Sequence, residues 1–515
     1  MKTLFLLQRN YKPKTMAKEN FMNSVKMSRP NRNRFDLSHD VKLSFNPGEL
    51  IPMCAIDVLP GDKFTIGCES LLRFQPLVAP VMHRSDFMMY YFFVPNRILW
   101  DNWETYMGNN NGESPLPAHP YMDVTAETWT RQLDYMGIPP ITGENTLRIN
   151  ALPFAAVQCI INEYFRDQNL LPERNFKLQD GANNADNDLY FLFNKAWEHD
   201  YFTSCLPWAQ KGAPVTIPVA NFQDVPVKVS NNAGTILDGT PISPNVDGEV
   251  STDPLIPADT LYAETSLLDA EATSINELRF AFRLQEWLEK YARGGSRYTE
   301  VIRAFWGVIS SDARLQRPEY ITGIKTPVVI SEVLNTTGTN DAPQGNMAGH
   351  GVAVTSGKYG TYYAEEHGWI IGLGCVQPKT AYQQGVDRKF FRLNSPTEYF
   401  WQQFQHIGEQ AVKVKEIYAD TTPEEQEEDF GYIPRYGEYR FESNRVAGDL
   451  RGNLSFWQWG RIFENKPELN DEFITCVPRR DIFAVTDPEE QVLIAHVYHK
   501  ISASRMMSKY GTPTF

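Results

Sequence analysis

Residues 87–94 form an apolar run, FMMYYFFV, that lacks the alternation of a surface strand. A strand with one face in water alternates apolar and polar side chains, whereas this run contains only aromatic residues, methionines and one valine. Pro95 ends the run, and Trp100 and Trp103 follow it. We therefore predict a strand with one face in a sandwich core and the other covered by inserted helices or a neighbouring subunit.

Other strand patterns lie at both ends of the sequence. Residues 41–59 and 62–78 precede the apolar run, and turn signals such as PGD (60–62) separate them without an intervening helix. Three further segments, TPVVISEVL (326–334), GWIIGLGCV (368–376) and EEQVLIAHVYHKIS (489–502), lie in the second half. These patterns predict a mainly β fold, a single eight-stranded antiparallel jelly roll (a β-sandwich) with long helical and loop insertions between strands.

Two helices are expected between the strand patterns. The first covers 151–167, with a proline in its first turn. The second covers 275–292, where Ser274 and Glu277 form a capping box and two glycines follow the last turn. Its predicted buried side is marked by Leu278, Phe282, Leu288 and Tyr291.

Two segments have the composition of surface excursions. Residues 217–273 are rich in Asn, Asp, Gly, Pro, Ser and Thr, and residues 220–275 contain nine acidic side chains and one lysine. Residues 335–360 form a second variable segment, rich in Gly, Thr and Asn. We interpret 217–273 as an acidic surface insertion with short strands at most, because loops of this length in a compact chain usually serve a function.

Charge divides the chain into an arm and a body. The net charge is −14, yet residues 1–43 contain ten Lys and Arg against three Asp and Glu. We expect residues 1–40 to be a basic, flexible arm and residues 41–515 to be the folded domain. No segment approaches the ~20 apolar residues that cross a bilayer, and the apolar stretch at 4–7 is too short for a signal peptide, so no membrane partner is expected.

No catalytic constellation emerges from the sequence. The six cysteines form no C-x-x-C pair and are expected to be buried thiols. His496 and His499 lie in a strand pattern, where residues three apart point to opposite faces, so no metal site is predicted there. Glu365 and Glu366 are adjacent and cannot by themselves form a facing carboxylate pair. We therefore expect no catalytic residues, no cofactor and no metal.

Aromatic residues near arginine are the more informative feature. They recur in HDYFTSCLPWAQKG (199–212), FGYIPRYGEYRF (430–441) and SFWQWGRIF (455–463). Such residues build a core, pack a subunit interface or stack on nucleic-acid bases, and the pattern alone leaves these roles open. The candidate core or subunit-interface aromatics are Phe92, Phe93, Trp100, Trp103, Trp208, Tyr436 and Tyr439.

Several long blocks together resemble one protein family. They are FFVPNRILWDNWE (92–104), HDYFTSCLPWAQKG, GGSRYTEVIRAFWGVISSDARLQRPEY (294–320), EEHGWIIG (365–372) and FGYIPRYGEYRF. In this order they resemble the major capsid proteins of small icosahedral single-stranded DNA phages, the Microviridae, and most closely the gokushovirus-like branch. The resemblance runs from about residue 29 to the C-terminal KYGTP (509–513).

The resemblance implies a structural protein of the virion with no enzymatic activity. Sixty copies would close a T=1 shell, through pentamer and trimer contacts, around a circular single-stranded DNA genome in the bacterial host cytoplasm. It places a threefold protrusion at 217–273, which would meet a bacterial surface receptor. It also implies two virion partners, a small basic DNA-binding protein and a pilot or minor protein.

Genome contact requires positive charge on the inner face of such a shell. The candidate DNA-facing residues are Arg29, Arg32, Arg34, Arg479, Arg480, Lys500, Arg505 and Lys509.

Two other function classes compete with this interpretation. A carbohydrate-binding or carbohydrate-active β-sandwich would explain the aromatic content and scattered acids, but the carboxylate constellation of a hydrolase is missing. A monomeric single-stranded DNA binder conflicts with the acidic body. The oligomeric state separates both alternatives from a shell protein.

Overall fold

Strand β5 (Ser85–Pro95) contains the apolar run and lies inside a sheet, between β14 and β18. The computed structural model describes residues 31–108, 116–185, 187–213, 215, 275–295, 297–334, 347–355, 357 and 359–510, together with short strands between residues 227 and 263. The side chains of β5 alternate between two cores. Phe87 and Phe93 enter one core, whereas Phe92 and Val94 enter another on the opposite face of the sheet.

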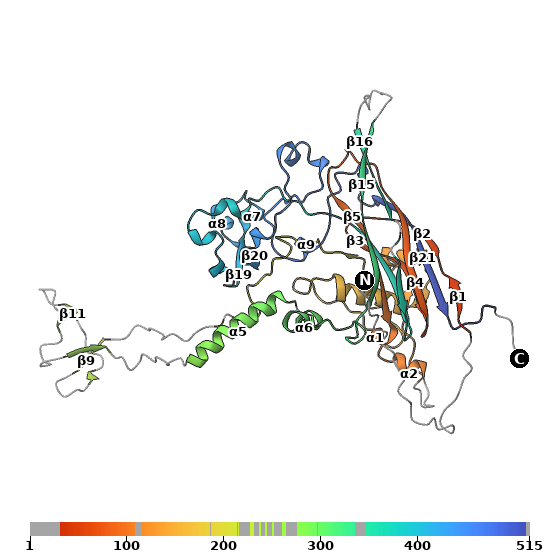
Figure 1. Cartoon of the computed structure of the whole chain (residues 1–515), viewed down its shortest axis with the longest axis horizontal. Helices are drawn as coiled ribbons and strands as arrows, with labels where there is room; N and C mark the ends of the chain where they lie inside the picture. The colour runs from red at the N-terminus through yellow and green to blue at the C-terminus, as the bar shows by residue number, and fades with distance from the viewer. Residues whose placement is uncertain are drawn as a thin grey trace, which may run out of the picture.

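Two antiparallel sheets form the sandwich (Figure 1). We call the first the covered sheet, with the order β14-β5-β18-β3-β8. The second, the open sheet, has the order β1-β21-β4-β16-β15, with β2 also paired to β21 and β17 to β4. The covered sheet consists of β5, β3 (Glu49–Val58), β8 (Phe193–Asn194), β14 (Glu319–Pro327) and β18 (Gly368–Pro378). The open sheet consists of β1 (Asn33–Asp36), β2 (His39–Phe45), β4 (Lys63–Phe74), β15 (Val329–Leu334), β16 (Met347–Thr355), β17 (Gly360–Tyr363) and β21 (Leu493–Arg505).

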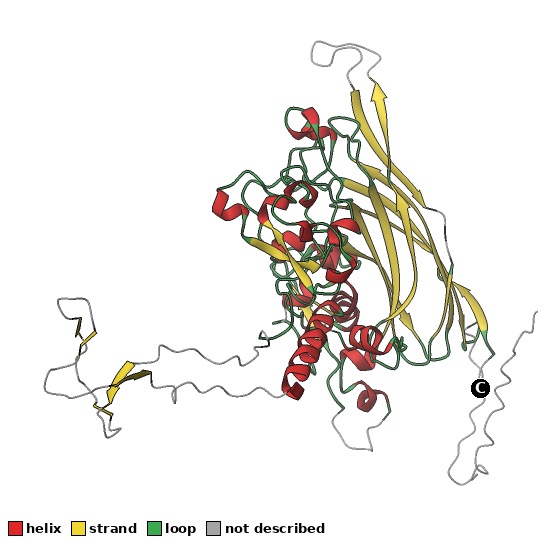
Figure 2. Ribbon diagram, turned by 60° about the vertical axis from the view of Figure 1, so that its left-hand side comes forward, coloured by secondary structure: helices red, strands yellow, loops and turns green. Residues whose placement is uncertain are grey.

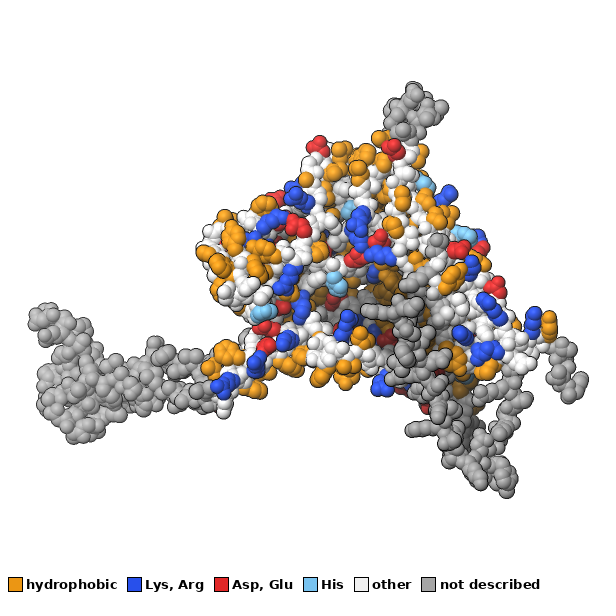
Figure 3. All heavy atoms as spheres, viewed as in Figure 1, with side chains coloured by type: hydrophobic (Ala, Val, Ile, Leu, Met, Phe, Trp, Pro, Cys, Tyr) orange, Lys and Arg blue, Asp and Glu red, His pale blue; other side chains and the backbone are white. Residues whose placement is uncertain are grey.

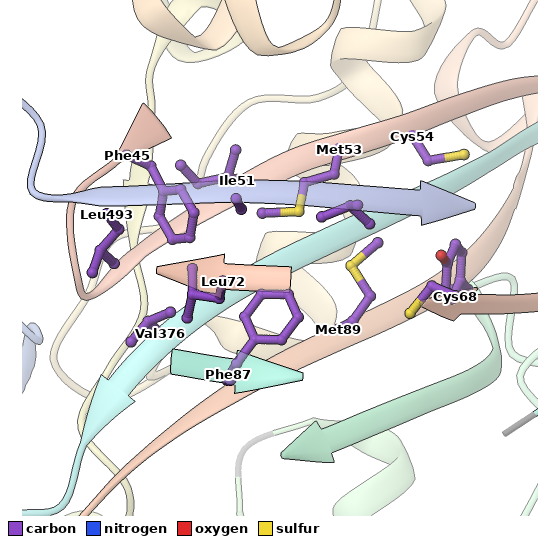
Figure 4. Close-up of a cluster of buried hydrophobic side chains, with 14 of the residues drawn as sticks. Phe45, Ile51, Met53, Cys54, Cys68, Leu72, Phe87, Met89, Val376 and Leu493 are labelled. Carbon is purple, nitrogen blue, oxygen red and sulfur yellow. The ribbon is translucent and has the colours of Figure 1, made fainter. Parts of the chain in front are cut away.

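The sandwich core lies between the two sheets (Figure 4). Phe45 and Leu72 approach it from the open sheet, while Ile51, Phe87 and Met89 approach from the covered sheet. Residues near 45 and near 493 lie in one core because β2 pairs with β21, where Phe45 lies opposite Leu493. The predicted mainly β sandwich with helical and loop insertions is therefore confirmed.

Two long insertions interrupt the sandwich, and their helices gather on one side of it (Figure 2). The first insertion, residues 96–318, joins β5 to β14, and the second, residues 379–492, joins β18 to β21. Elements of the first insertion are α1 (Asn96–Leu99), α2 (Trp103–Met107), β6 (Tyr121–Val124), α3 (Arg131–Tyr135), β7 (Leu147–Asn150), α4 (Leu152–Ile160), β9 (Val227–Ser230), β10 (Ile236–Leu237), β11 (Ser243–Pro244), β12 (Val250–Ser251), β13 (Thr260–Ala263), α5 (Ile275–Arg293) and α6 (Tyr298–Trp306). Elements of the second are β19 (Glu409–Lys413), α7 (Val414–Ile417), α8 (Pro423–Gln426), β20 (Asp429–Pro434) and α9 (Asp471–Ile474).

Helix α4 explains why the apolar run does not alternate. Every residue of α4 is buried, and the helix packs against the outer face of the covered sheet together with Trp100. On that face Phe92 lies 4.7 Å from the Tyr164 ring, measured between ring centroids. The prediction that inserted helices cover the second face is confirmed.

The structure confirms the first expected helix and the buried cysteines, and it moves the start of the first strand pattern. The helix expected at 151–167 is present as α4 followed by a π-helical turn, Ile161–Phe165. The strand pattern begins before residue 41, because β1 and the start of β2 already pair with β21. All six cysteines are buried free thiols, as expected. Residues 1–30, including Arg29, and Ser274 of the expected capping box lie outside the described residues.

The predicted buried side of α5 is wrong in one respect. Phe282 is 62% exposed, and Leu278, Leu288 and Tyr291 are only partly buried. The helix extends away from the sandwich toward β9 and β11, so its apolar stripe finds little of its own chain to contact (Figure 1). Helical periodicity identified the stripe correctly, but it cannot tell which surface covers that stripe.

Candidate functional site

Helices α5 and α6 form an apolar surface that the described part of the chain leaves largely exposed. At the end of α5, Gly295 adopts a left-handed φ of 97°, and α6 begins at Tyr298. The indole of Trp287 stacks on Tyr291 with ring centroids 5.2 Å apart. Phe280, Tyr298 and Trp306 are 67–70% exposed. We call this the helical surface; its exposed apolar members are Phe280, Phe282, Trp287, Tyr298, Trp306, Val308 and Ile309.

The end of α5 is nevertheless firmly anchored. Arg293 forms an ion pair with Glu409 of β19, and both side chains are largely shielded from solvent. Arg293 also donates hydrogen bonds to the backbone oxygens of Ser204 and Tyr432, at 3.1 and 3.2 Å. One end of the helix is thus fixed to the second insertion while the rest presents its side chains to solvent.

A second apolar surface covers part of the second insertion. Phe400 packs against Tyr436 at 5.2 Å and Tyr439 at 6.1 Å between ring centroids. Beneath these rings, Arg392 forms a 3.1 Å ion pair with Glu438, and its guanidinium lies 4.2 Å from the Tyr439 ring centroid. We call this the aromatic surface; its exposed members are Phe390, Leu393, Tyr399, Phe400, Trp401, Ile407, Tyr439 and Phe441.

Both surfaces bring together several large exposed apolar side chains. Hydrophobic side chains gather over the lobe that carries α7, α8 and β20 and along α5 and α6 (Figure 3). Monomeric proteins rarely show contiguous apolar patches above a few hundred Å², and larger patches mark interaction sites. Each buried aromatic side chain removes about 150–250 Å² from water, so a few such residues suffice for a strong contact.

The outer face of the open sheet has a different character. The strand register places Arg34, Lys42, Arg73 and Lys500 on this face, outside the sandwich core. Acidic side chains share the face, and Lys500 lies 3.4 Å from Glu69. Contact with Tyr359 and with that carboxylate raises the pKa of Lys500, which keeps the lysine cationic.

The candidate DNA-facing residues fall into two groups. Arg32, Arg34, Lys500 and Lys509 are exposed on or beside the open sheet. Arg479, Arg480 and Arg505 hold other parts of the fold, and Arg29 lies outside the described residues. Arg505 pairs with the buried Asp62 at 2.9 Å.

Two of these residues hold the loops before β21. Arg480 donates to the backbone oxygens of Asp487 and Pro488, at 3.0 and 2.9 Å. Arg479 donates to the oxygens of Ser455 and Gln458, both at 2.9 Å, and lines a groove of about 660 Å³.

The candidate aromatic residues also divide into buried and exposed side chains. Phe92, Phe93, Trp100 and Tyr436 are almost fully buried within this chain. Trp103 and Trp208 are partly buried, and Tyr439 is 49% exposed on the aromatic surface. Sequence reasoning missed most of both apolar surfaces. The signal was available in PTEYFWQQF (396–404), where three consecutive aromatic residues, and a fourth at 404, interrupt a polar segment.

Within the described part of the chain, no helix is long and apolar enough to cross a membrane. The comparisons with known proteins agree with one another. A family model described as capsid protein (F protein) matches residues 23–515. The chain is 36% identical over 520 residues to capsid protein VP1 of Bdellovibrio phage phiMH2K, covering 94% of this chain and 95% of that protein. It is 31% identical to capsid protein VP1 of Chlamydia phage 1 and 30% identical to that of Spiroplasma virus 4, with the same coverage of both chains.

A structural role in a virion accounts for the uncovered apolar surfaces, for the absence of a catalytic motif in the sequence and for these relatives. The chain therefore belongs to the phage capsid protein (F protein) family, as a major capsid protein of the Microviridae-like single-stranded DNA phages.

Proposed function

We propose that sixty copies of this chain close a T=1 icosahedral shell around a circular single-stranded DNA genome. The observation that carries the proposal is the pair of uncovered apolar surfaces at two different places on one chain. A closed shell from one kind of chain needs heterologous contacts around rotation axes, so each copy must present more than one distinct interface. Permanent interfaces commonly bury roughly 2,000–5,000 Å² and resemble a core cut in half.

The two surfaces take separate parts in this assembly. Helix α5 follows the acidic insertion directly, and we assign the helical surface to contacts around the threefold axes. The aromatic surface then serves the remaining pentamer and trimer contacts. Electron microscopy of the purified full-length protein or of virions should show uniform small shells. A chain that remains monomeric at all salt and protein concentrations would refute the proposal.

The strand order supports a jelly-roll assignment for the sandwich. The eight long strands, in chain order, are β2, β3, β4, β5, β14, β16, β18 and β21. Numbered one to eight, they give the order 1-8-3-6 in the open sheet and 2-7-4-5 in the covered sheet. This pairing of first with last and second with seventh is the arrangement of two interlocked Greek keys.

We place the open sheet on the inner side of the shell. The inserted helices lie on the other side of the sandwich, and α5 and β9 extend away from the open sheet (Figure 1). The exposed cations Arg32, Arg34, Lys500 and Lys509 would then meet DNA phosphates, with Arg29 of the arm. Such contacts are independent of sequence and weaken as salt rises.

A matched pair of lysine substitutions tests this orientation. Lys500→Gln removes a half-exposed cation paired with Glu69 on the open sheet. Lys177→Gln removes a similarly exposed cation, paired with Asp101 at 2.8 Å in the first insertion. We expect Lys500→Gln to lower the packaged DNA per shell, measured by the ratio of absorbance at the nucleic-acid and protein maxima. An equal loss with Lys177→Gln, or none with either, would refute the inward orientation.

We propose that the acidic insertion, residues 217–273, faces outward and contacts a bacterial surface receptor. Its acidic composition repels the genome and suits an exposed position. Deleting 220–272 should leave shells that still form but bind host cells poorly. Loss of all assembly would instead show that the segment is needed for trimer contacts.

Further partners follow from the net charge of −14. An acidic coat cannot by itself neutralise a packaged genome, so we propose a small basic DNA-binding protein inside the shell, together with a pilot or minor virion protein, and assembly in the host cytoplasm. Shells purified without that basic protein should contain less DNA. Undiminished DNA content would remove that role.

A further inference from the structure

Two histidines and a cysteine meet at one end of the sandwich core. His39 of β2 and His499 of β21 are direct partners in the strand register, and their ring centroids lie 5.0 Å apart. Cys54 of β3 approaches from the facing sheet. The nearest potential ligand atoms of these three residues all lie within 4.8 Å of one another.

A β-bulge brings the cysteine into this position. In the pairing of β18 with β3, Gly372 faces Cys54 and Leu373 faces Pro52, which leaves Met53 as an extra residue. Strict alternation from the inward-facing Met53 would turn Cys54 away from the core. Because the bulge resets the alternation, Met53 and Cys54 both lie in the inter-sheet core. Figure 4 shows Cys54 and Cys68 at the same end of that core.

The environment of His499 leaves one ring nitrogen available. The residue is fully buried, and its Nδ1 lies 2.7 Å from the Tyr91 hydroxyl. Its Nε2 is buried and has no hydrogen-bond partner among the described residues, although the Met53 backbone carbonyl faces the ring. If Nδ1 donates its proton to the Tyr91 oxygen, Nε2 keeps its lone pair and can act as a ligand; in the other tautomer, Nε2 carries the proton and faces the Met53 carbonyl. A hydrogen bond of this kind orients most metal-binding histidines in proteins.

The donor set selects a class of ion. Two imidazole nitrogens and one thiolate suit Zn²⁺ or Cu⁺, whereas Mg²⁺ and Ca²⁺ prefer oxygen ligands. Zinc–ligand bonds of about 2.0–2.3 Å require neighbouring ligand atoms roughly 3.3–3.8 Å apart, so the three atoms must close by about 1 Å. His39 can supply this movement, because it lies on a partly exposed edge strand, and a water molecule can reach the open position from its side.

We propose that His39, Cys54 and His499 form a binding site for a thiophilic cation, Zn²⁺ or Cu⁺, which joins the two sheets of the sandwich. Cys54 binds as the thiolate and releases its proton to solvent. The ion ties the edge strand β2 to β21 and to the facing strand β3. It thereby fixes the start of β2, directly after β1, against the rest of the sandwich.

Cobalt provides a spectroscopic test on the full-length protein. The reduced protein is stripped with a chelator and titrated with Co²⁺, which replaces Zn²⁺ in such sites. We expect a thiolate-to-cobalt charge-transfer band in the near ultraviolet that excess Zn²⁺ abolishes. Competition between the protein and a Cu⁺-specific chelator then distinguishes Cu⁺ from Zn²⁺ as the preferred ion. Absence of the band in the wild-type protein would overturn the proposal.

Variants identify the ligands. Cys54→Ser should abolish the band, and His39→Asn, at the exposed edge, should weaken Co²⁺ binding at least tenfold without unfolding the chain. The controls are Cys159→Ser, a buried thiol in the other core, and His496→Asn, an exposed histidine on the same strand as His499. Both controls should keep the band. A band that persists in Cys54→Ser, or binding unchanged in His39→Asn, would show that the cluster serves only to pack the core.

Discussion

Phe282 allows assembly to be tested separately from folding. The side chain lies in α5 and is 62% exposed, so truncating it removes little packing within its own chain. An aromatic side chain has about 150–250 Å² to bury, so roughly 100 Å² of Phe282 remains for a neighbouring subunit. At about 25 cal/mol per Å², that area contributes about 2.5 kcal/mol, or about 60-fold in an association constant.

The matched control is its neighbour Arg283, which is exposed on the same helix and pairs with Glu286 at 2.6 Å. Both changes to alanine preserve or raise helix propensity. We expect Phe282→Ala to raise the protein concentration needed for shell formation by about one to two orders of magnitude. Arg283→Ala should leave it nearly unchanged. Sedimentation velocity measures assembly, and thermal unfolding of the unassembled chain checks stability. Equal assembly of Phe282→Ala and wild type would refute the assignment of this helix to an interface.

Three further predictions concern the folded chain itself. Phe92→Ala should lower the free energy of unfolding by about 3–5 kcal/mol, measured by urea denaturation, because it opens a cavity between the covered sheet and α4. Burial disfavours the charged form of Glu198, but its ion pairs with Lys325 and Lys379 outweigh this and lower its pKa to about 2. The ion pairs therefore contribute their full stabilisation above pH about 4.5, and this stabilisation is lost as the pH falls toward about 2. The urea concentration at the unfolding midpoint should fall over this pH range in the wild type. In Glu198→Gln, which has no carboxylate to titrate, it should change less over the same range. Gly368→Ala should destabilise the chain by about 1–3 kcal/mol in the same assay, since its new Cβ would overlap the Val94 backbone oxygen and the Phe93 ring; unchanged unfolding would show that the sheet adapts there.

Local pattern determined much of the sandwich. The absence of alternation in Phe87–Val94 predicted a strand covered on both faces, and both cores are present. The two helices were predictable because each combines a 3.6-residue period with its own end signals. Segments with weak local signals could not be predicted in this way. The variable segment at 335–360 contains β16, whose small residues form a strand by pairing with β15 and β4.

The features that local patterns did not predict depend on which strands, distant in the sequence, pair with one another. A strand pattern fixes which side chains share a face, but not which distant strand lies opposite. His39, Cys54 and His499 are therefore unrelated in the sequence and meet only because β2 pairs with β21 and a bulge turns Cys54 inward. For the same reason the sequence marked the apolar stripe of α5, while only the tertiary structure shows that Phe280, Phe282 and Trp287 stay exposed among the described residues.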